Sequence, residues 1–451
     1  MARSRRFEMD MTVGALLPKV LLFSLPLIAS SILQLLFNAA DMVVVGQWAG
    51  PEPLAAVGST GSLINLMVNV FMGLSVGGSV VIAKAYGAHD PEAVHKGVHT
   101  SMTLALIAGI LVAVVGFVFC RPLLQLMDNP ELELATLYMQ IYFLGMPANM
   151  VYNFGAAILR AVGDTRRPLI YLFIAGVVNV VLNLIMVIVF HLSVSGVAVA
   201  TVVSQIVSAV LVVTCLIRTT GGVHLDIKSL RIHKRQLGEI LRVGLPAGLQ
   251  GSLFSISNVL IQSSVNSFGS IVVAANSAAG NLEGFVYTSM NAIHQAALTF
   301  GSQNLGAGRI DRVKRSMWVC LGTVTVIGIV MGNLFYLAGA PLLSLYNNNA
   351  QVIHYGLIRM AYILPLYFLC GLMDVIVGTL RGIGYAIMPM IVSLTGACLF
   401  RVVWIYTIFA ADPTLDTLYI SYPISWGLTF AVHMLCYAFI ARKKLNGYLK
   451  A

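Results

Sequence analysis

The sequence predicts an all-α polytopic membrane protein, in which twelve transmembrane helices form two six-helix lobes related by a pseudo-two-fold axis along the membrane normal. Three observations lead to this fold class. Hydrophobic residues make up 58% of the 451 residues and charged residues only 10%, whereas soluble domains carry about 25% charged residues. Apolar runs of about 20 residues, long enough to cross a bilayer, recur along the chain. The two halves of the chain also resemble each other.

The apolar runs are too long and too uniform for barrel strands, so we expect helices. In chain order the predicted spans are residues 17–46, 54–83, 98–120, 134–159, 168–190, 194–217, 240–267, 271–302, 316–338, 353–380, 387–410 and 418–441. We expect an N-lobe at 1–217, a basic cytoplasmic linker at 218–239 and a C-lobe with a short basic tail at 240–451. We expect no signal peptide, because the basic N-terminus leads into a full-length span.

The positive charges lie on one side of the predicted membrane. With the N-terminus in the cytoplasm, the cytoplasmic loops and the two termini collect 24 of the 27 Lys and Arg residues, while acidic residues gather in the opposite loops. This distribution follows the positive-inside rule and predicts a multi-pass protein of the cell membrane with both termini cytoplasmic. It also accounts for the net charge of +10 without nucleic-acid binding. The six cysteines are scattered singly, a pattern typical of small core residues rather than of a metal site.

The two halves match at a nearly constant offset. The short texts LRAVGDTRRP and LRGIGYAIMP correspond, as do AKAYGAHD and SQNLGAGR. The corresponding residues lie 219 to 221 positions apart and are Pro26 and Pro246, Gly50 and Gly269, Gly61 and Gly280, Gly87 and Gly306, Pro122 and Pro341, Arg160 and Arg381, Gly163 and Gly384, and Pro168 and Pro389. Because each half has an even number of spans, the repeats are expected to be parallel and to enclose a central cleft.

The sequence lacks the dinucleotide-binding, Walker and zinc-protease motifs GxGxxG, GxxxxGK[ST] and HExxH. We therefore expect no nucleotide-driven pump, no enzymatic activity and no cofactor. Transport would then draw energy from an ion gradient or from the solute itself. The charged residues that we expect deep inside the predicted spans are Asp41, Glu283, Asp374 and Arg401, and Arg359 lies in or at the edge of its span. Ionisable residues at membrane depth commonly mark ion or substrate pathways.

In the N-lobe, Asp41 has polar residues on neighbouring spans as possible partners. Asn179 and Asn183 are four residues apart and so share one helix face, and Thr201 lies in the next span. Their oxygens could hold a sodium ion together with the Asp41 carboxylate, or could respond to protonation of the acid. The alternative is hydrogen bonding between helices without an ion. Gln34 precedes Asp41 at helical spacing and is a candidate for contact with the substrate.

In the C-lobe, Glu283 and Arg401 are expected at overlapping depths, so a structural ion pair between them is possible. Asp374 is expected to face the cleft, and Glu283 is a second candidate for holding a positively charged substrate. The aromatic and Met candidates for substrate contact are Tyr142, Tyr287 and Met290. Beside acids, such side chains suit lipophilic cations through apolar contact and cation–π attraction.

About residues 15 to 442 resemble the multidrug and toxic compound extrusion (MATE) transporters. The resemblance lies in LPLIASSILQLLFNAADMVVVG, LAAVG, LRAVGDTRRP, NVVLN, GVAVATVVSQ, FGSQNLGAG and LRGIG. It implies a twelve-helix, two-lobe fold and export of cationic amphipathic drugs against proton or sodium entry. It also implies that Asp41 is the coupling acid, with Asn179 and Thr201 as partners. Asn183 stands where many members have an acid, which makes a single proton the simpler coupling ion.

The sequence therefore predicts a monomeric antiporter in contact with membrane lipids, which exports small organic cations in exchange for protons or sodium ions by alternating access. The alternative is a flippase for a lipid-linked precursor, which would favour a cleft lined with Arg or Lys. Three deep acids against one deep arginine argue against that alternative. A receptor or scaffold without transport activity is a third class, and no predicted extramembrane domain supports it.

Overall fold

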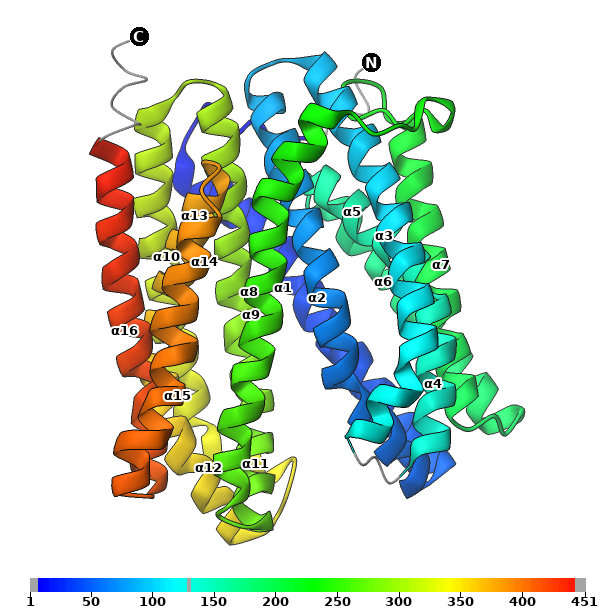
Figure 1. Ribbon diagram of the computed structural model, residues 1–451, viewed down its shortest axis with the longest axis vertical. Helices are drawn as coiled ribbons and strands as arrows, with labels where there is room; N and C mark the ends of the chain where they lie inside the picture. Colours follow the sequence, from blue (N-terminus) through cyan, green and yellow to red (C-terminus); the bar gives the residue numbers. More distant parts are fainter. Residues whose placement is uncertain (1–6, 128–130, 443–451) are drawn as a thin grey trace. The chain divides into compact units, whose positions relative to one another are not determined.

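The computed structural model describes residues 7–127 and 131–442, and these are almost entirely helical (Figure 1). Every predicted span coincides with one helix or with consecutive helices of one run. The α-helices are α1 (Leu16–Val44), α2 (Pro51–Gly87), α3 (Pro91–Leu126), α4 (Leu132–Leu144), α5 (Met146–Ala161), α6 (Arg166–Leu184), α7 (Val194–Arg218), α8 (Lys234–Asn266), α9 (Ser270–Gly306), α10 (Ile310–Leu337), α11 (Gly339–Ser344), α12 (Ala350–Ile363), α13 (Phe368–Gly382), α14 (Ile387–Ser393), α15 (Phe400–Trp404) and α16 (Leu415–Ile440).

Several runs contain short segments of other helix types. Short π-helices follow α1 at Val45–Ala49 and α6 at Ile185–Val189, and two more flank α15 at Leu394–Leu399 and Ile405–Phe409. By length and composition alone, eight of the described helical runs could cross a membrane. A ninth span is possible if α12 and α13, whose axes differ by 47°, are taken together. The two ends of the chain, residues 1–6 and 443–451, lie outside the described residues, so their predicted cytoplasmic location stays a prediction.

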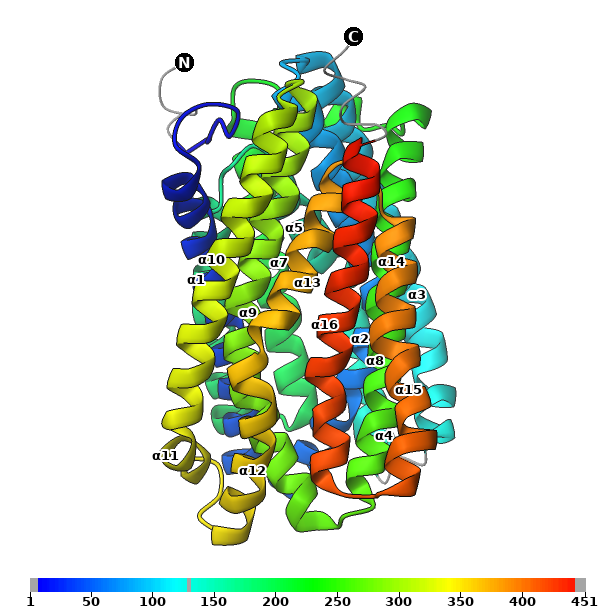
Figure 2. The same cartoon turned by 90° about the vertical axis from the view of Figure 1, so that its left-hand side faces the viewer.

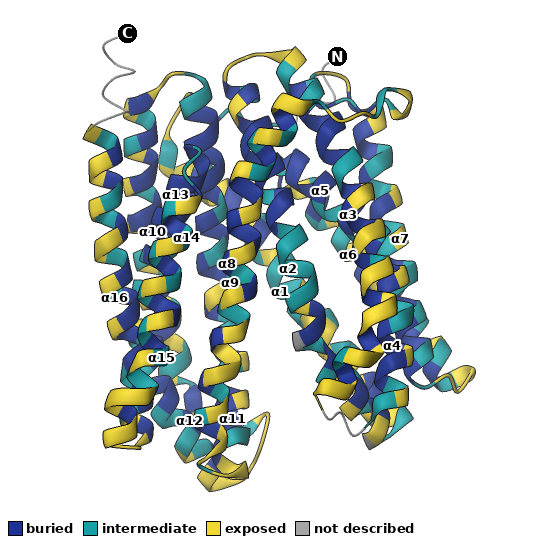
Figure 3. Ribbon diagram, viewed as in Figure 1, coloured by how far each residue is buried: buried dark blue, intermediate teal, exposed yellow. Residues whose placement is uncertain are grey.

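The lipid-facing character of the surface is visible on single helices. On α3, Ile110, Val114 and Val118 follow one another at four-residue spacing and are 56%, 57% and 58% exposed (Figure 3). An exposed apolar stripe of this kind would be unfavourable in water but suits the hydrocarbon region of a bilayer.

The backbone confirms the internal repeat. Three pairs of residues at the predicted offsets share a positive φ: Gly50 and Gly269, His89 and Gly308, and Gly163 and Gly384. Each pair ends or begins equivalent helices, because a left-handed residue is a common way to close a helix. The hydrogen bonds agree, since the amide of Asp164 donates to Leu159 as the amide of Tyr385 donates to Leu380. The two halves are therefore copies of one structural plan.

The chain forms two compact units. The N-terminal unit comprises Met1–Asp10 and Ala29–Ser252, and the C-terminal unit comprises Met11–Ile28 and Leu253–Ala451. These units differ from the predicted lobes in two segments, because the first part of α1 belongs to the C-terminal unit and the first part of α8 to the N-terminal unit. Figure 2 shows the same helices from the side, with α9, α13 and α16 running along one another in the C-terminal unit.

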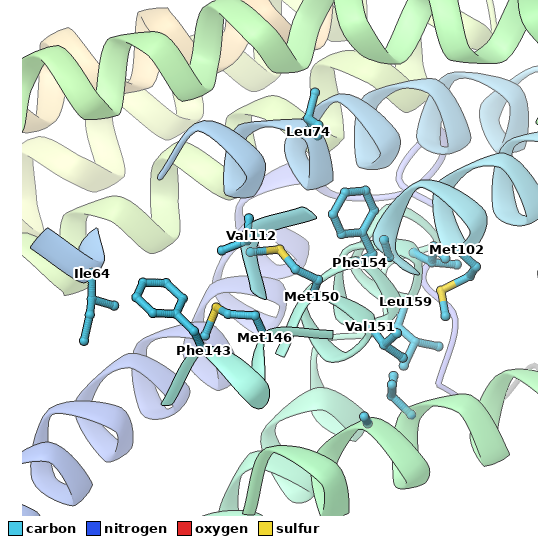
Figure 4. Close-up of a cluster of buried hydrophobic side chains, with 14 of the residues drawn as sticks. Ile64, Leu74, Met102, Val112, Phe143, Met146, Met150, Val151, Phe154 and Leu159 are labelled. Atoms are coloured by element: carbon cyan, nitrogen blue, oxygen red, sulfur yellow. The ribbon is translucent and has the colours of Figure 1, made fainter. Parts of the chain in front are cut away.

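The core of the N-terminal unit is built around α3, α4 and α5. Phe143, Met146, Met150 and Phe154 are at most 1% exposed and project from α4 and α5 into one apolar cluster (Figure 4). Gly116 of α3 makes room for this cluster, because a Cβ atom there would overlap the ring of Phe143. Close packing of this kind fixes the positions of α4 and α5. The polar site described below lies on neighbouring helices, so its geometry depends on this packing.

Glycines explain why the start of α8 packs within the N-terminal unit. Gly73 of α2 faces Gly248 of α8, and a Cβ atom on either residue would lie closer than 3.0 Å to the backbone of the other helix. Gly77 and Gly244 repeat the arrangement one turn away. Small residues four apart let helix backbones approach closely in membranes. In the C-terminal unit, the first part of α1 is held differently: Phe23 packs edge-on against Phe300 of α9 at 6.3 Å between ring centroids.

Candidate ion and substrate sites

Asp41 lies in the N-terminal unit, on the last turn of α1, within reach of α6 and α7. The side-chain amide of Asn183 donates a hydrogen bond to the Asp41 carboxylate. No ion pair involves Asp41 in the ranges 7–127 and 131–442. A half-buried carboxylate without a cationic partner is free to exchange a proton or to bind a small cation, because no fixed positive charge competes for it.

The predicted partners of Asp41 do come together. Asn183 is fully buried, and its Nδ2 also lies 3.4 Å from Oδ1 of Asn179. Asn179 in turn donates to the hydroxyl of Thr201 at 3.4 Å, and that hydroxyl donates to the carbonyl of Val197 at 3.0 Å. The four side chains thus form one connected polar row across α1, α6 and α7. The buried Oδ1 of Asn183 accepts no hydrogen bond within the described residues, which leaves an oxygen available beside the acid.

Two tyrosines and a glutamine extend this polar row. Tyr142 hydrogen-bonds to Gln205, and its ring stacks on that of Tyr138 at 6.0 Å between centroids. Tyr138 is 8% exposed and lies near enough to Asp41 to interact with its charge. The sequence pointed to Tyr142 and Gln205 but not to Tyr138. Helical spacing could have found it, because Tyr138 precedes Tyr142 by four residues.

The second half of α1 is positioned by close packing on α6. The ring of Phe37 occupies the space that a side chain at position 176 would need, so Gly176 allows the two helices to approach. Asp41, one turn after Phe37, thereby comes beside Asn183. The π-helices Val45–Ala49 and Ile185–Val189 begin just after Asp41 and Asn183, and such segments are frequent at functional sites. Gln34 is exposed on α1, two turns before the acid.

In the C-terminal unit, Glu283 pairs with Arg359 of α12, so the predicted pair of Glu283 with Arg401 is wrong. Nε and Nη2 of Arg359 lie 2.8 Å from the two carboxylate oxygens of Glu283, and both residues are less than 9% exposed. Arg359 also donates to Asn276 at 2.6 Å. The predicted membrane depths of Glu283 and Arg401 allowed a pair between them. In the structure α12 packs directly on α9, and this packing places Arg359 rather than Arg401 beside Glu283.

Arg401 has a different environment. Its Nε donates to the hydroxyl of Ser425 at 2.9 Å, and its guanidinium lies 4.3 Å from the ring centroid of Tyr422 and 5.5 Å from that of Trp426. Arg401 is 5% exposed, and its Nη2 has no hydrogen-bond partner among the described residues. Aromatic faces attract a cation, but they leave its hydrogen-bond donors unsatisfied.

The remaining substrate candidates of the C-terminal unit separate into two groups. Tyr287 donates its hydroxyl to the half-buried carboxylate of Asp374 and is 37% exposed, so these two residues present an accessible polar pair. Met290 is 1% exposed and its sulfur packs where Gly328 and Gly371 leave space, so it belongs to the helix-packing interior. Arg381 of the same helix acts electrostatically on Asp374.

Four cationic and aromatic residues of this unit were not predicted as site residues: Arg359, Arg381, Tyr422 and Trp426. From the sequence, Arg359 lay in or at the edge of a span and Arg381 in a cytoplasmic loop, whereas both are 8% exposed inside α12 and α13. The signal was present, since residues 353–380 were predicted as one span that contains Arg359. Tyr422 and Trp426, four residues apart on α16, share one helix face.

Comparison with known proteins agrees with this fold. The MatE family model matches the chain twice, at residues 26–185 and 246–407, and these two matches start 220 residues apart, as the internal repeat requires. The chain therefore belongs to the MatE family. It is a multi-span membrane protein, and its predicted fold class of twelve transmembrane helices in two lobes is confirmed.

Individual relatives cover most of the chain. It is 29% identical to the probable multidrug resistance protein YoeA of Bacillus subtilis, over 83% of this chain and 82% of that protein. It is 26% identical to an FAD transporter of Shewanella oneidensis, over 76% of this chain and 77% of that protein. A solved structure described as the outward-facing conformation of a multidrug resistance MATE family transporter has a TM-score of 0.90 at 22% identity and covers 99% of both chains. At that identity the likeness concerns the fold.

Proposed function

We propose that the protein is a secondary active exporter of small amphipathic molecules, driven by exchange of a proton or a sodium ion at Asp41. The observation that carries the proposal is the polar row of the N-terminal unit, in which Asn183 donates to an acid that has no cationic partner among the described residues. The name of the Bacillus subtilis relative supports drug-like substrates. Family membership supports a transporter rather than an enzyme, located in the cell membrane.

The same row defines how the ion would be held. When Asp41 is ionised, its carboxylate and the oxygens of Asn183, Asn179 and Thr201 provide the ligands that sodium prefers. When Asp41 is protonated, the carboxyl oxygen still accepts from the Asn183 amide, and its own proton can be donated to an oxygen nearby. A single carboxylate makes the proton the simpler coupling ion. Alternating access would couple this binding to exposure of the substrate on either side of the membrane.

The buried charges do not by themselves assign a positive charge to the substrate. The preference for cations rested on three deep acids against one deep arginine, but Arg359 and Arg381 are buried as well. Asp374, with Tyr287 as its donor, remains the predicted contact for a positively charged group. The alternative, a flippase for a lipid-linked precursor, would favour a cleft lined with Arg or Lys. The buried Arg359 and Arg381 therefore support this alternative more than the single deep arginine predicted from the sequence. Efflux of a water-soluble dye distinguishes an exporter from that flippase.

The test is gradient-driven efflux from cells and from liposomes that contain the purified protein. Ethidium serves as a cationic dye and fluorescein as an anionic one, each under a pH gradient alone and under a sodium gradient alone. Asp41→Asn should abolish efflux while the protein still inserts and folds. Asp90→Asn is the matched control, because Asp90 is an exposed helix N-cap at which Asn also caps. Efflux by Asp41→Asn at the rate of the control would refute the proposal.

A further inference from the structure

The interior of the C-terminal unit carries more positive than negative charge. Among the described residues, the acids of this interior are Glu283 and Asp374, and its buried arginines are Arg359, Arg381 and Arg401. Glu283 forms an ion pair with Arg359 through two hydrogen bonds. The negative charge of Asp374 interacts with Arg381. Arg401 forms no ion pair in the part of the chain that the structure describes. Burying an unpaired guanidinium is costly, so this arginine calls for a partner that carries negative charge.

The surroundings of Arg401 hold the guanidinium in place without satisfying it. Ser425 fixes Nε, and Tyr422 covers one face of the planar group at 4.3 Å. The buried Nη2 is left without a hydrogen-bond partner among the described residues. A planar fork of donors is suited to a carboxylate, sulfonate or phosphate, which can accept two parallel hydrogen bonds.

Stacked rings lead from an accessible side chain to this arginine. Tyr287 is 37% exposed, and its ring stacks on that of Tyr367 at 6.4 Å between centroids. Tyr367 packs on Trp426 at 5.1 Å, and Trp426 lies 5.5 Å from the guanidinium of Arg401. Because the faces of these rings cover one another, their edges are the surfaces left for contact with a planar aromatic compound.

The internal repeat gives an independent reason to see a site here. Helices α7 and α16 are equivalent and begin at Val194 and Leu415, 221 residues apart. The same offset carries Thr201 to Tyr422 and Gln205 to Trp426. The α7 positions that belong to the polar row of the N-terminal unit therefore correspond to the α16 positions that contact Arg401 in the C-terminal unit. One structural plan thus holds two polar sites of opposite charge.

We propose that Arg401, with Tyr422 and Trp426, binds the anionic group of a planar aromatic substrate whose rings lie along Tyr367 and Tyr287. The role of this ligand as a substrate rests on the proposed transport function, but its binding does not. An aromatic ligand is favoured over a lipid headgroup because the side chains that lead to Arg401 are rings rather than further cations.

The test is equilibrium binding to the full-length protein in nanodiscs, with no ion gradient. The probes are flavin mononucleotide and riboflavin, which share one ring system and differ by a phosphate. The wild-type protein should bind the mononucleotide at least about tenfold more tightly than riboflavin, as expected for a charge-assisted hydrogen bond. In Arg401→Gln the mononucleotide should bind no better than riboflavin, while riboflavin affinity stays within about twofold of wild type.

Further variants separate binding from folding and from transport. Arg401→Lys keeps the charge but loses the planar fork, so its preference for the mononucleotide should fall at least about threefold and not vanish; this variant decides the matter if Arg401→Gln does not fold. Asp41→Asn should keep the full preference for the mononucleotide over riboflavin. The binding result can therefore be read even if the proposed export function is wrong.

Three results would overturn the proposal: equal binding of the two flavins to the wild type, an unchanged preference in both Arg401 variants, or a parallel loss of both flavins in Arg401→Gln. The last would assign Arg401 to helix packing. Binding is also measured with and without phosphatidylglycerol in the nanodisc. The same affinity for the mononucleotide in both nanodiscs supports an aromatic ligand. Loss of mononucleotide binding when phosphatidylglycerol is present would instead indicate that Arg401 binds the lipid phosphate.

Discussion

Replacing Glu283 by Gln should destabilise the protein by about 3–5 kcal/mol, the usual cost of removing one partner of a buried ion pair. The substitution keeps the size of the side chain but leaves the Arg359 guanidinium, 8% exposed, without its carboxylate. The Asn276 oxygen at 2.6 Å and the rings of Tyr419 and Tyr422, each 5.5 Å from the guanidinium, would remain. These neutral neighbours cannot replace the two charge-assisted hydrogen bonds.

The assay is unfolding of the purified protein in detergent, followed by the reaction of buried cysteines with a fluorescent maleimide during denaturation. Glu133→Gln is the matched control, because it removes the acid from an ion pair with Arg121 in which the two side chains are 73% and 50% exposed. That change should cost no more than about 1 kcal/mol. Equal stability losses for the two glutamine variants would refute the buried pair.

A double-mutant cycle tests the corrected pairing directly. Glu283→Gln and Arg359→Gln should be strongly non-additive, because the second substitution removes the charge that the first leaves unpaired. Glu283→Gln and Arg401→Gln should be additive within about 0.5 kcal/mol. Strong coupling of Glu283 to Arg401 would restore the pairing expected from the sequence.

Two further predictions concern the N-terminal unit. Gly73→Val should strongly reduce the yield of folded protein, because the valine side chain would overlap the backbone at Gly248. The control is Gly238→Ala, where no atom lies within 4 Å of the added Cβ, and this change should leave the stability unchanged or raise it slightly. The segment between α7 and α8 should loosen on acidification, because Nε2 of His233 accepts a hydrogen bond from Nε of Arg231 at 3.1 Å. Burial, and then the charge of Arg231, lower the pKa of His233 below its usual 6.5, so the stability from neutral His233 is full above 6.5 and is lost as pH falls from 6.5 through the lowered pKa. Hydrogen exchange at pH 7.5 and 5.5, corrected for intrinsic rates, should show faster exchange at low pH, and His233→Gln should remove that difference.

The sequence predicted the repeat and the polar row around Asp41 because both leave local signals. Asn179 and Asn183 share a helix face by their spacing alone, and Thr201 lies in the following span. The offset between the halves relates residues without any knowledge of contacts. Such features depend on helical periodicity and on duplication, which a single sequence records.

The pairing in the C-terminal unit could not be predicted in the same way. Depth in the membrane can be counted along a span, but the order of helices around the unit cannot. Arg401 was compatible with Glu283 by depth, but the packing of α12 on α9 places Arg359 at the acid instead. The placement of the first part of α8 in the N-terminal unit likewise depends on close packing at Gly73 and Gly248 rather than on local sequence.

The central proposal is that Asp41 exchanges a coupling ion during export. The most direct measurement is ion movement driven by substrate: a substrate gradient is imposed on sealed liposomes that contain the protein, and internal pH and internal sodium are recorded with fluorescent indicators. The wild type should move one of the two ions against the substrate, and Asp41→Asn should move neither. Ion movement by Asp41→Asn equal to that of the wild type, or substrate transport by the wild type without movement of either ion, would contradict the proposal.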